Sequence, residues 1–266
     1  MSCPDCIAGG LLPGEPTGIS STQGAYFASP PSEGPSRSAI ILLTDVFGLP
    51  LKNCKIIADR LAKEVGCDVW VPDLFAGWPV MPLSELQAVA RTGGKLTFFQ
   101  MLRFYLSMLP RIPALIASRP AVVATRLSNF VKAIQEEKKY EKLGAVGYCF
   151  GGSTAIRLGG TDLVHSIVVC HPGPFSMAEA KAIKVPAAWV CAEVDQFFAD
   201  SSRLNVEAIF AERKGKENFL DYEFKIYKGT IHGFAIRPDL ANPEVKEGYE
   251  GAMQQIVAWF SKTLVV

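Results

Sequence analysis

The chain has little net charge, no long unbroken apolar segment and only three histidines, and each shortage narrows the range of functions. A formal net charge of +1 provides no excess of the kind that binds nucleic acid or an anionic membrane surface. The most apolar stretch, residues 96–117, is interrupted by charged residues and prolines, which argues against a membrane-spanning helix. We therefore expect a small-molecule partner, and neither nucleic acid nor a membrane.

Signals for secretion are also missing. There is no Asn-X-Ser/Thr sequon, and the first twenty residues lack the basic start and apolar run of a signal peptide. The seven cysteines are odd in number, and a chain of 266 residues buries a large core without needing disulfides. We expect a cytoplasmic protein, and the sequence leaves open whether it is a monomer or a homodimer.

Cys3 and Cys6 are spaced like half of a zinc site or a redox pair. No second pair with matching spacing follows, and no histidine lies near them. Redox pairs of the thioredoxin type follow a strand, and no strand is expected before these residues. We therefore predict no metal site and interpret the pair as part of a loosely docked arm.

Three regions differ in composition. Residues 1–37 are rich in Gly, Pro and Ser and are expected to form an N-terminal arm with one short strand near residues 25–28. Residues 38–266 are expected to form a single domain. Within it, residues 76–118 are too long for a plain crossover and predict one or two extra helices, either over the strand ends or as additional core packing.

From residue 38 onward, short apolar runs alternate with segments of helix length. The expected strands are residues 39–44, 68–71, 142–148, 163–170, 187–192 and 222–227, and the expected helices are residues 51–65, 118–138, 151–158, 201–213 and 243–263. Strands separated by helices predict an α/β protein with a mostly parallel sheet covered on both faces. In such sheets the functional residues gather at the carboxyl ends of the strands.

Cys149 lies in a Gly-x-Cys-x-Gly-Gly motif that joins a predicted strand to a predicted helix. This is the nucleophile-elbow pattern with cysteine in place of serine. Gly147 and Gly151 leave room for backbone where a side chain would clash, and the start of the following helix favours a thiolate. The alternatives are a buried, inert cysteine or a phosphate-binding loop. The second is disfavoured because neither phosphate-loop fingerprint is present.

A catalytic thiol needs a base and a group that orients the base. In α/β-hydrolases these follow the nucleophile in the order acid, then histidine. His232 follows the last predicted strand and is the predicted base, whereas His165 and His171 come too soon after Cys149. Asp195, just after the strand at residues 187–192, is the predicted acid, with Glu193 as its competitor.

With these residues assigned, the chain resembles the dienelactone hydrolase family from about residue 38 to its C-terminal helix. The resemblance is carried by five short motifs, Thr44-Asp-Val-Phe-Gly48, Pro72-Asp-Leu-Phe75, Gly147-Tyr-Cys-Phe-Gly-Gly152, Glu193-Val-Asp195 and His232-Gly-Phe234. It implies an α/β-hydrolase fold, no cofactor, and cleavage of a lactone or related ester through an acyl-enzyme. The family's nucleophile, acid and base match Cys149, Asp195 and His232.

The resemblance assigns three further roles. The family's oxyanion hole maps to the backbone N–H groups of Phe150 and Val46. Asp45 stands where the family usually has a glutamate that contacts the resting thiol and gates its activation. Bacterial members bind the substrate carboxylate through an arginine four residues after the histidine, where this chain has Ile236 and then Arg237.

The long insert and the N-terminal arm resemble the fungal branch of the family, whose substrates include bulkier, polyketide-like esters. The residues expected to contact the substrate are Tyr148, His171, Phe234, Arg237 and Phe104. For His171 a structural role in its loop is an equal alternative. A general carboxylesterase or acyl thioesterase, and a non-hydrolytic member that binds or isomerises a polyketide, stay open as other functions.

Overall fold

The structure is a computed structural model that describes residues 9–32, 34–86 and 109–266. In this part of the chain, eight strands form one sheet in the order β1-β2-β4-β3-β5-β6-β7-β8. The strands are β1 (Ile19–Ser20), β2 (Tyr26–Ala28), β3 (Ser38–Leu43), β4 (Asp68–Val71), β5 (Lys142–Tyr148), β6 (Ser166–Cys170), β7 (Ala187–Val194) and β8 (Tyr222–Ile231). All pairings from β4 to β8 are parallel, and the predicted α/β class is confirmed.

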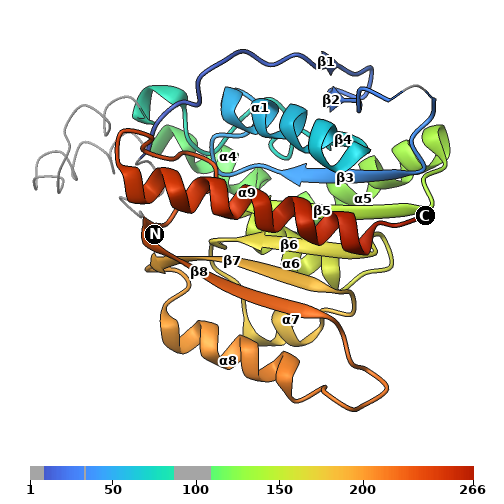
Figure 1. The fold of residues 1–266 in the computed structure, drawn as a ribbon. Helices are drawn as coiled ribbons and strands as arrows, with labels where there is room; N and C mark the ends of the chain where they lie inside the picture. The colour runs from blue at the N-terminus through green and yellow to red at the C-terminus, as the bar shows by residue number, and fades with distance from the viewer. Residues whose placement is uncertain (1–8, 33, 87–108) are drawn as a thin grey trace, which may run out of the picture.

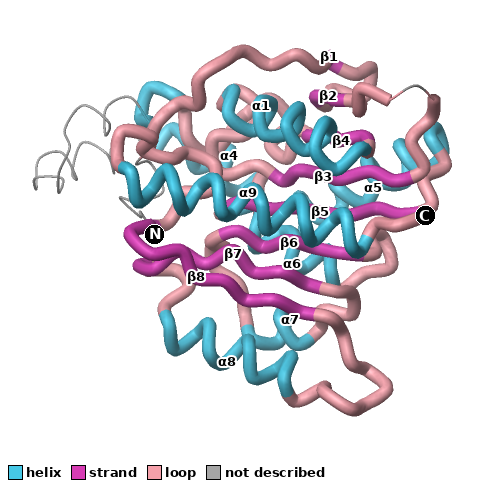
Figure 2. Tube along the Cα trace, in the orientation of Figure 1, coloured by secondary structure: helices cyan, strands magenta, loops and turns pink. Residues whose placement is uncertain are grey.

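Helices cover both faces of the sheet, as Figures 1 and 2 show. They are α1 (Lys52–Leu61, continued by a π-helical turn, Ala62–Gly66), α4 (Ile112–Ala117, after a 3₁₀ turn, Leu109–Arg111), α5 (Pro120–Lys138), α6 (Phe150–Gly159), α7 (Met177–Lys181), α8 (Asp200–Ala211) and α9 (Pro243–Thr263). In Figure 1, α1 and α9 lie in front of the sheet, and α5 and α6 lie behind it. Because both faces are covered, β3, β5 and β6 are almost wholly buried, as their continuous apolar runs predict.

The N-terminal arm joins the sheet. The strand expected near residues 25–28 forms as β2, which pairs antiparallel with β4. The hydroxyl group of Tyr26 donates a 2.6 Å hydrogen bond to Asp59 of α1, and Leu12 is buried in the core. From residue 9 onward the described part of the arm is therefore packed against the domain.

Several elements differ from the sequence expectation, and β8 and α7 show the physical reasons. Strand β8 continues to Ile231 instead of ending at residue 227, because a register shift against β7 and a positive φ of 68° at Gly229 carry the chain through an irregular step. Helix α7 was not expected, because five residues are too few to show a helical period. It begins at a capping box formed by Ser176 and Glu179.

The predicted insert at residues 76–118 is only partly visible. Residues 76–86 and 109–118 of the insert are described, with helix α4 near its C-terminal end, whereas residues 87–108, including Phe104, lie outside the described residues, as do Cys3 and Cys6. Among the helices of the described segments, none has the length and apolar content needed to cross a bilayer.

Candidate active site

Cys149 occupies a sharp turn between β5 and α6. Its backbone has φ 53° and ψ −111°, a conformation that is strained for a residue with a side chain. The turn is held by the Cys149 N–H, which donates to Cys170 at 3.2 Å, and by the Cys149 carbonyl, which accepts from Ser153 at 3.2 Å and Gly173 at 2.8 Å. Backbone hydrogen bonds from two neighbouring segments thus hold the nucleophile candidate in this conformation.

The glycines of the motif are required by close packing. A Cβ at Gly147 would collide with the carbonyl oxygen of Gly151, and a Cβ at Gly151 would collide with the carbonyl oxygen of Leu43 in β3. A Cβ at Gly152 would lie 2.9 Å from the Cα of Pro172. The first turn of α6 therefore approaches the ends of β3 and β6 at backbone contact distance, which places Cys149 above the sheet.

Asp195 and His232 follow the ends of the neighbouring strands β7 and β8. The His232 Nδ1 atom lies 2.9 Å from Oδ2 and 3.1 Å from Oδ1 of Asp195, and both side chains are almost completely buried. Asp195 Oδ1 also accepts the backbone N–H groups of Phe197 and Phe198, which fixes the carboxylate. A carboxylate at Nδ1 places the ring proton there and leaves Nε2 as the basic nitrogen.

The electrostatics of His232 favour its protonated form. Burial lowers the pKa of His232, but the charge of Cys149 and the hydrogen bond to Asp195 outweigh it and raise the pKa to about 10. An imidazolium at residue 232 and a thiolate at residue 149 stabilise each other.

The competing acid, Glu193, lies elsewhere. Its Oε2 atom accepts the N–H of Gly229 at 2.8 Å, at an exposed site. His165 is likewise a structural residue, because its Nδ1 atom accepts the N–H of Leu143 at 3.0 Å. Among the acids considered from the sequence, the structure brings Asp195 to the imidazole.

A buried ion pair lies beside Cys149. Asp45 Oδ2 accepts from Arg237 Nε at 2.7 Å, and Asp45 Oδ1 accepts the N–H of Phe47 at 3.0 Å; the side chains of Asp45 and Arg237 are 0% exposed. Burial raises the pKa of Asp45 to about 6, with Arg237 opposing this rise and the charge of Cys149 adding to it. Arg237, expected to contact the substrate, here neutralises Asp45, and the expected contact stays a prediction.

The other expected substrate contacts are buried residues whose rings meet at His171, next to His232. Tyr148, His171 and Phe234 are at most 2% exposed, and the His171 ring centre lies 5.1 Å from that of His232. Burial holds the pKa of His171 well below its ordinary value, so its ring is neutral. Neither of its ring nitrogens has a hydrogen-bond partner within the described segments. Direct substrate contact by these three residues stays a prediction.

The structure adds one aromatic residue to the site. Phe197 lies edge-on to His232, with ring centres 5.2 Å apart. It makes an apolar contact with the ring, whereas the Asp195 carboxylate makes a polar one. Its position two residues after Asp195 is the one signal in the sequence that marks it. The proposed oxyanion donors, Val46 and Phe150, are half-buried, and the N–H of Phe150 belongs to the first turn of α6, where backbone donors lack intrahelical partners.

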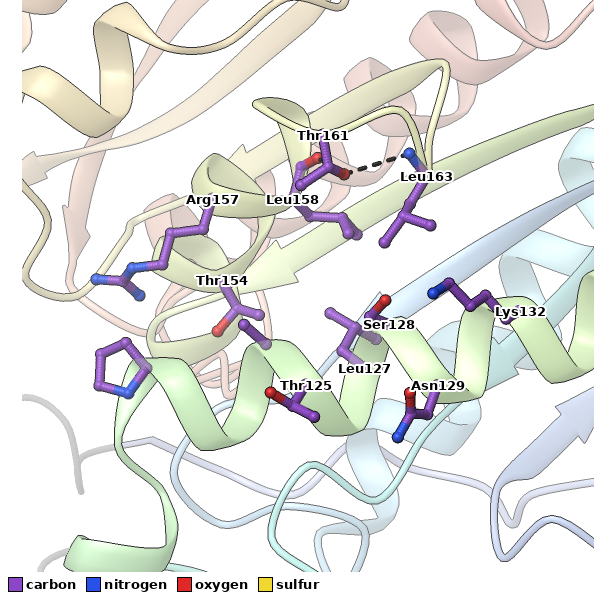
Figure 3. Close-up of a pocket in the computed structure, with 12 residues that line it drawn as sticks. Thr125, Leu127, Ser128, Asn129, Lys132, Thr154, Arg157, Leu158, Thr161 and Leu163 are labelled. Atoms are coloured by element: carbon purple, nitrogen blue, oxygen red, sulfur yellow. Dashed lines mark hydrogen bonds between the residues drawn. The ribbon is translucent and has the colours of Figure 1, made fainter.

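A surface groove of about 460 Å³ lies between α5 and α6 (Figure 3). Its polar lining includes Thr125, Lys132, Thr154, Arg157 and Thr161, and the Thr161 hydroxyl accepts from the N–H of Leu163. Cys149, Asp195 and His232 do not line it, so this groove is not the candidate active site. Across the described ranges, no group of three or more His, Cys, Asp or Glu residues is arranged to hold a metal ion.

Comparison with known proteins matches the chain to one family and to two hydrolases of similar length. The sequence model of the Dienelactone hydrolase family matches residues 24–264. Hydrolase pyvD from Aspergillus violaceofuscus is 31% identical over 262 residues, which cover 97% of this chain and 96% of that protein. Hydrolase tropI from Talaromyces stipitatus is 29% identical over 244 residues, which cover 89% of this chain and 85% of that protein.

Solved structures share the fold. A dienelactone hydrolase from Anabaena variabilis superposes with a TM-score of 0.55 at 15% identity, covering 94% of this chain and 99% of that one. Carboxyl esterase 2 from Tuber melanosporum superposes with a TM-score of 0.58 at 16% identity, covering 97% of this chain and 91% of that one. At these identities the likeness establishes the α/β-hydrolase fold.

Proposed function

The chain belongs to the dienelactone hydrolase family and is an ester hydrolase, and from that premise we propose that it cleaves a lactone or ester through an acyl-enzyme on Cys149. The observation that carries the proposal is the buried His232–Asp195 pair beside a cysteine held at a strained strand-to-helix turn. A histidine oriented by a carboxylate next to a nucleophile is the arrangement that acyl transfer requires.

In the first half of the proposed reaction, His232 accepts the proton of Cys149 and the thiolate attacks the substrate carbonyl carbon. The carbonyl oxygen becomes an oxyanion, which the N–H groups of Phe150 and Val46 stabilise. One such donor contributes about 3–4 kcal/mol to lowering the barrier. As the intermediate collapses, the C–O bond breaks and the leaving alkoxide takes the proton from His232. The acyl group stays on sulfur.

In the second half, His232 takes a proton from water and the hydroxide attacks the thioester carbonyl. The C–S bond breaks, the acid is released, and the proton on His232 neutralises the thiolate or remains paired with it. Esters and lactones suit this nucleophile better than amides. An alkoxide leaves more readily than an amine from an intermediate whose other leaving group is a thiolate.

Asp45 is proposed to gate the thiol. Its carboxylate lies close enough to Cys149 that a negative charge on each group repels the other. In this structure Arg237 neutralises the carboxylate. His232 remains the base that takes the proton of the thiol, and the charge of Asp45, set by its contact with Arg237, controls how readily the thiolate forms. Asp45 is one methylene shorter than the glutamate of the family pattern, so the reach of this carboxylate is the point to test.

For the substrate, we propose a small hydrophobic or polyketide-like lactone or ester. Two fungal hydrolases match this chain over most of its length, which supports the resemblance to the fungal branch. Phe197 packs against the ring of His232 and Phe234 packs against the neighbouring His171, and these aromatic side chains favour an apolar acyl group. A general carboxylesterase or an acyl thioesterase would use the same residues and would differ only in substrate preference.

The proposal is tested with a panel of lactones, aryl esters and acyl thioesters, read by hydrolysis rate and by intact mass after rapid acid quenching. We expect a Cys149 acyl adduct and turnover that Cys149→Ala abolishes. Cys67→Ala is the matched control, because Cys67 is a buried cysteine at the opposite end of the sheet and should leave turnover unchanged. Ester hydrolysis that survives Cys149→Ala would refute the acyl-enzyme on Cys149. A native protein that hydrolyses no member of the panel, but binds a polyketide with an affinity that Cys149→Ala leaves unchanged, would favour the non-hydrolytic alternative.

A further inference from the structure

One buried amide fastens the N-terminal arm to the loop after the catalytic histidine. Asn53 is the second residue of α1 and is 0% exposed. Its Oδ1 atom accepts the N–H of Leu12 at 2.9 Å, and its Nδ2 atom donates to the carbonyl groups of Gly10 and Ile236, each at 2.9 Å. One acceptor faces a donor and one NH₂ group faces two acceptors, so these partners fix the orientation of the amide.

The arm also rests directly on the backbone of Arg237. The N–H of Gly10 donates to the Arg237 carbonyl at 3.4 Å. Gly9 has φ +125°, and a Cβ there would lie 2.7 Å from the Cβ of Arg237 and would collide with its carbonyl oxygen. Only glycine permits this approach. Residues 9–12 and Asn53 therefore hold the Ile236–Arg237 backbone from two sides.

This contact is continuous with the catalytic centre. Arg237 donates from Nε to Asp45 at 2.7 Å, and the charges of Asp45 and Cys149 act on each other. Asp45 and the proposed oxyanion donor Val46 lie in the loop that leads into α1, where Asn53 stands. Asn53 thus joins three segments: the arm, the loop between β3 and α1, and the loop after His232.

We propose that Asn53, with Gly9 and Gly10, is a positioning residue that holds Arg237 against Asp45 and thereby sets the electrostatic field at Cys149. The inference rests on Cys149 being the nucleophile of the proposed function. It gives the N-terminal arm a role in the active centre, although the arm supplies no side chain to the reaction. Loosening the arm should leave the charge of Asp45 less neutralised and disfavour the thiolate.

The test is the pH dependence of Cys149 alkylation by iodoacetamide, resolved by peptide mass spectrometry. Asn53→Ala should move the midpoint of the profile upward by about one pH unit, the low end of what one opposite charge does to a buried acid. Gly9→Ala should produce a similar shift, and the double variant should shift no further than the larger single effect, because both act on Arg237.

The matched control is Ser166→Ala. Ser166 is a buried residue at the start of β6, where its hydroxyl group accepts from Trp259 at 2.9 Å and hydrogen-bonds Thr263 at 2.8 Å, far from the carboxyl ends of the strands. It should lower the thermal unfolding temperature and leave the alkylation midpoint unchanged.

If folded Asn53→Ala and Gly9→Ala variants keep the pH midpoint of Cys149 alkylation unchanged, the proposal is overturned. Asn53 would then only stabilise the packing of the arm. If Asn53→Ala does not fold, Gly9→Ala alone decides the question. Alkylation requires no substrate, so a failure to hydrolyse any ester would count against the proposed function and leave this result standing.

Discussion

Removing Arg237 should leave an uncompensated charge in the core. Asp45 and Arg237 are both 0% exposed and joined by a 2.7 Å hydrogen bond, so Arg237→Met strands the carboxylate without access to water. Breaking one side of a buried ion pair costs about 3–5 kcal/mol of unfolding free energy. We expect that loss at about pH 8, where the carboxylate of the native protein is ionised.

The loss should depend on pH in a defined direction. The pKa of Asp45 is raised from 3.8 to about 6, so the folded state binds this proton more tightly than the unfolded state. Stability from Asp45 is therefore complete below the unfolded pKa and declines as pH rises to the folded pKa, by about 3 kcal/mol for a shift of about two units. Without Arg237 the pKa rises further, and the decline continues to higher pH.

The assay is urea unfolding of the native protein, Arg237→Met and Asp45→Asn/Arg237→Met at about pH 5 and about pH 8. The deficit of Arg237→Met should be small at the lower pH and large at the higher one. The double variant, which removes both charges, should recover most of the loss and show a flatter pH dependence. An equal deficit at both pH values would refute the charge argument and assign the loss to packing of Arg237 over the Phe47 ring.

Three further outcomes are expected. Asp195→Asn should lower kcat by about 10⁴-fold, because His232 loses the carboxylate that fixes its tautomer and stabilises its imidazolium form. Glu193→Gln should change kcat little, and equal effects of the two variants would contradict the assignment of the acid. Cys149 should be alkylated faster near neutral pH than Cys54, Cys67 and Cys191, because burial raises the pKa of those three thiols to about 12, and His232→Gln should remove the difference. Gly151→Ala should yield no stable fold, because its Cβ collides with the Leu43 carbonyl oxygen. Gly160→Ala should fold, because its Cβ would lie 3.2 Å from the Ala182 carbonyl oxygen. Soluble expression and circular dichroism distinguish the two variants.

Local pattern was sufficient for much of the fold. The bounds of β4, β5 and α9 agree with the expected residues 68–71, 142–148 and 243–263, because apolar runs closed by turn residues and long helical periods are properties of adjacent residues. The continuation of β8 to Ile231 was missed because it depends on pairing with β7 through an irregular step. Helix α7 was missed because its capping box stabilises a segment too short to show periodicity.

By itself, the sequence determined the strand-to-helix turn at Cys149 and the glycines that the turn requires, and it predicted the order along the chain of the proposed nucleophile, acid and histidine. These features follow from steric limits and from residues that end consecutive strands. Only the tertiary structure decided that Arg237 neutralises Asp45 from a loop 192 residues away, and that Asn53 ties the arm to the same loop. Such pairings depend on how the sheet orders its strands and on which charges burial forces together, and no local pattern in the chain encodes either.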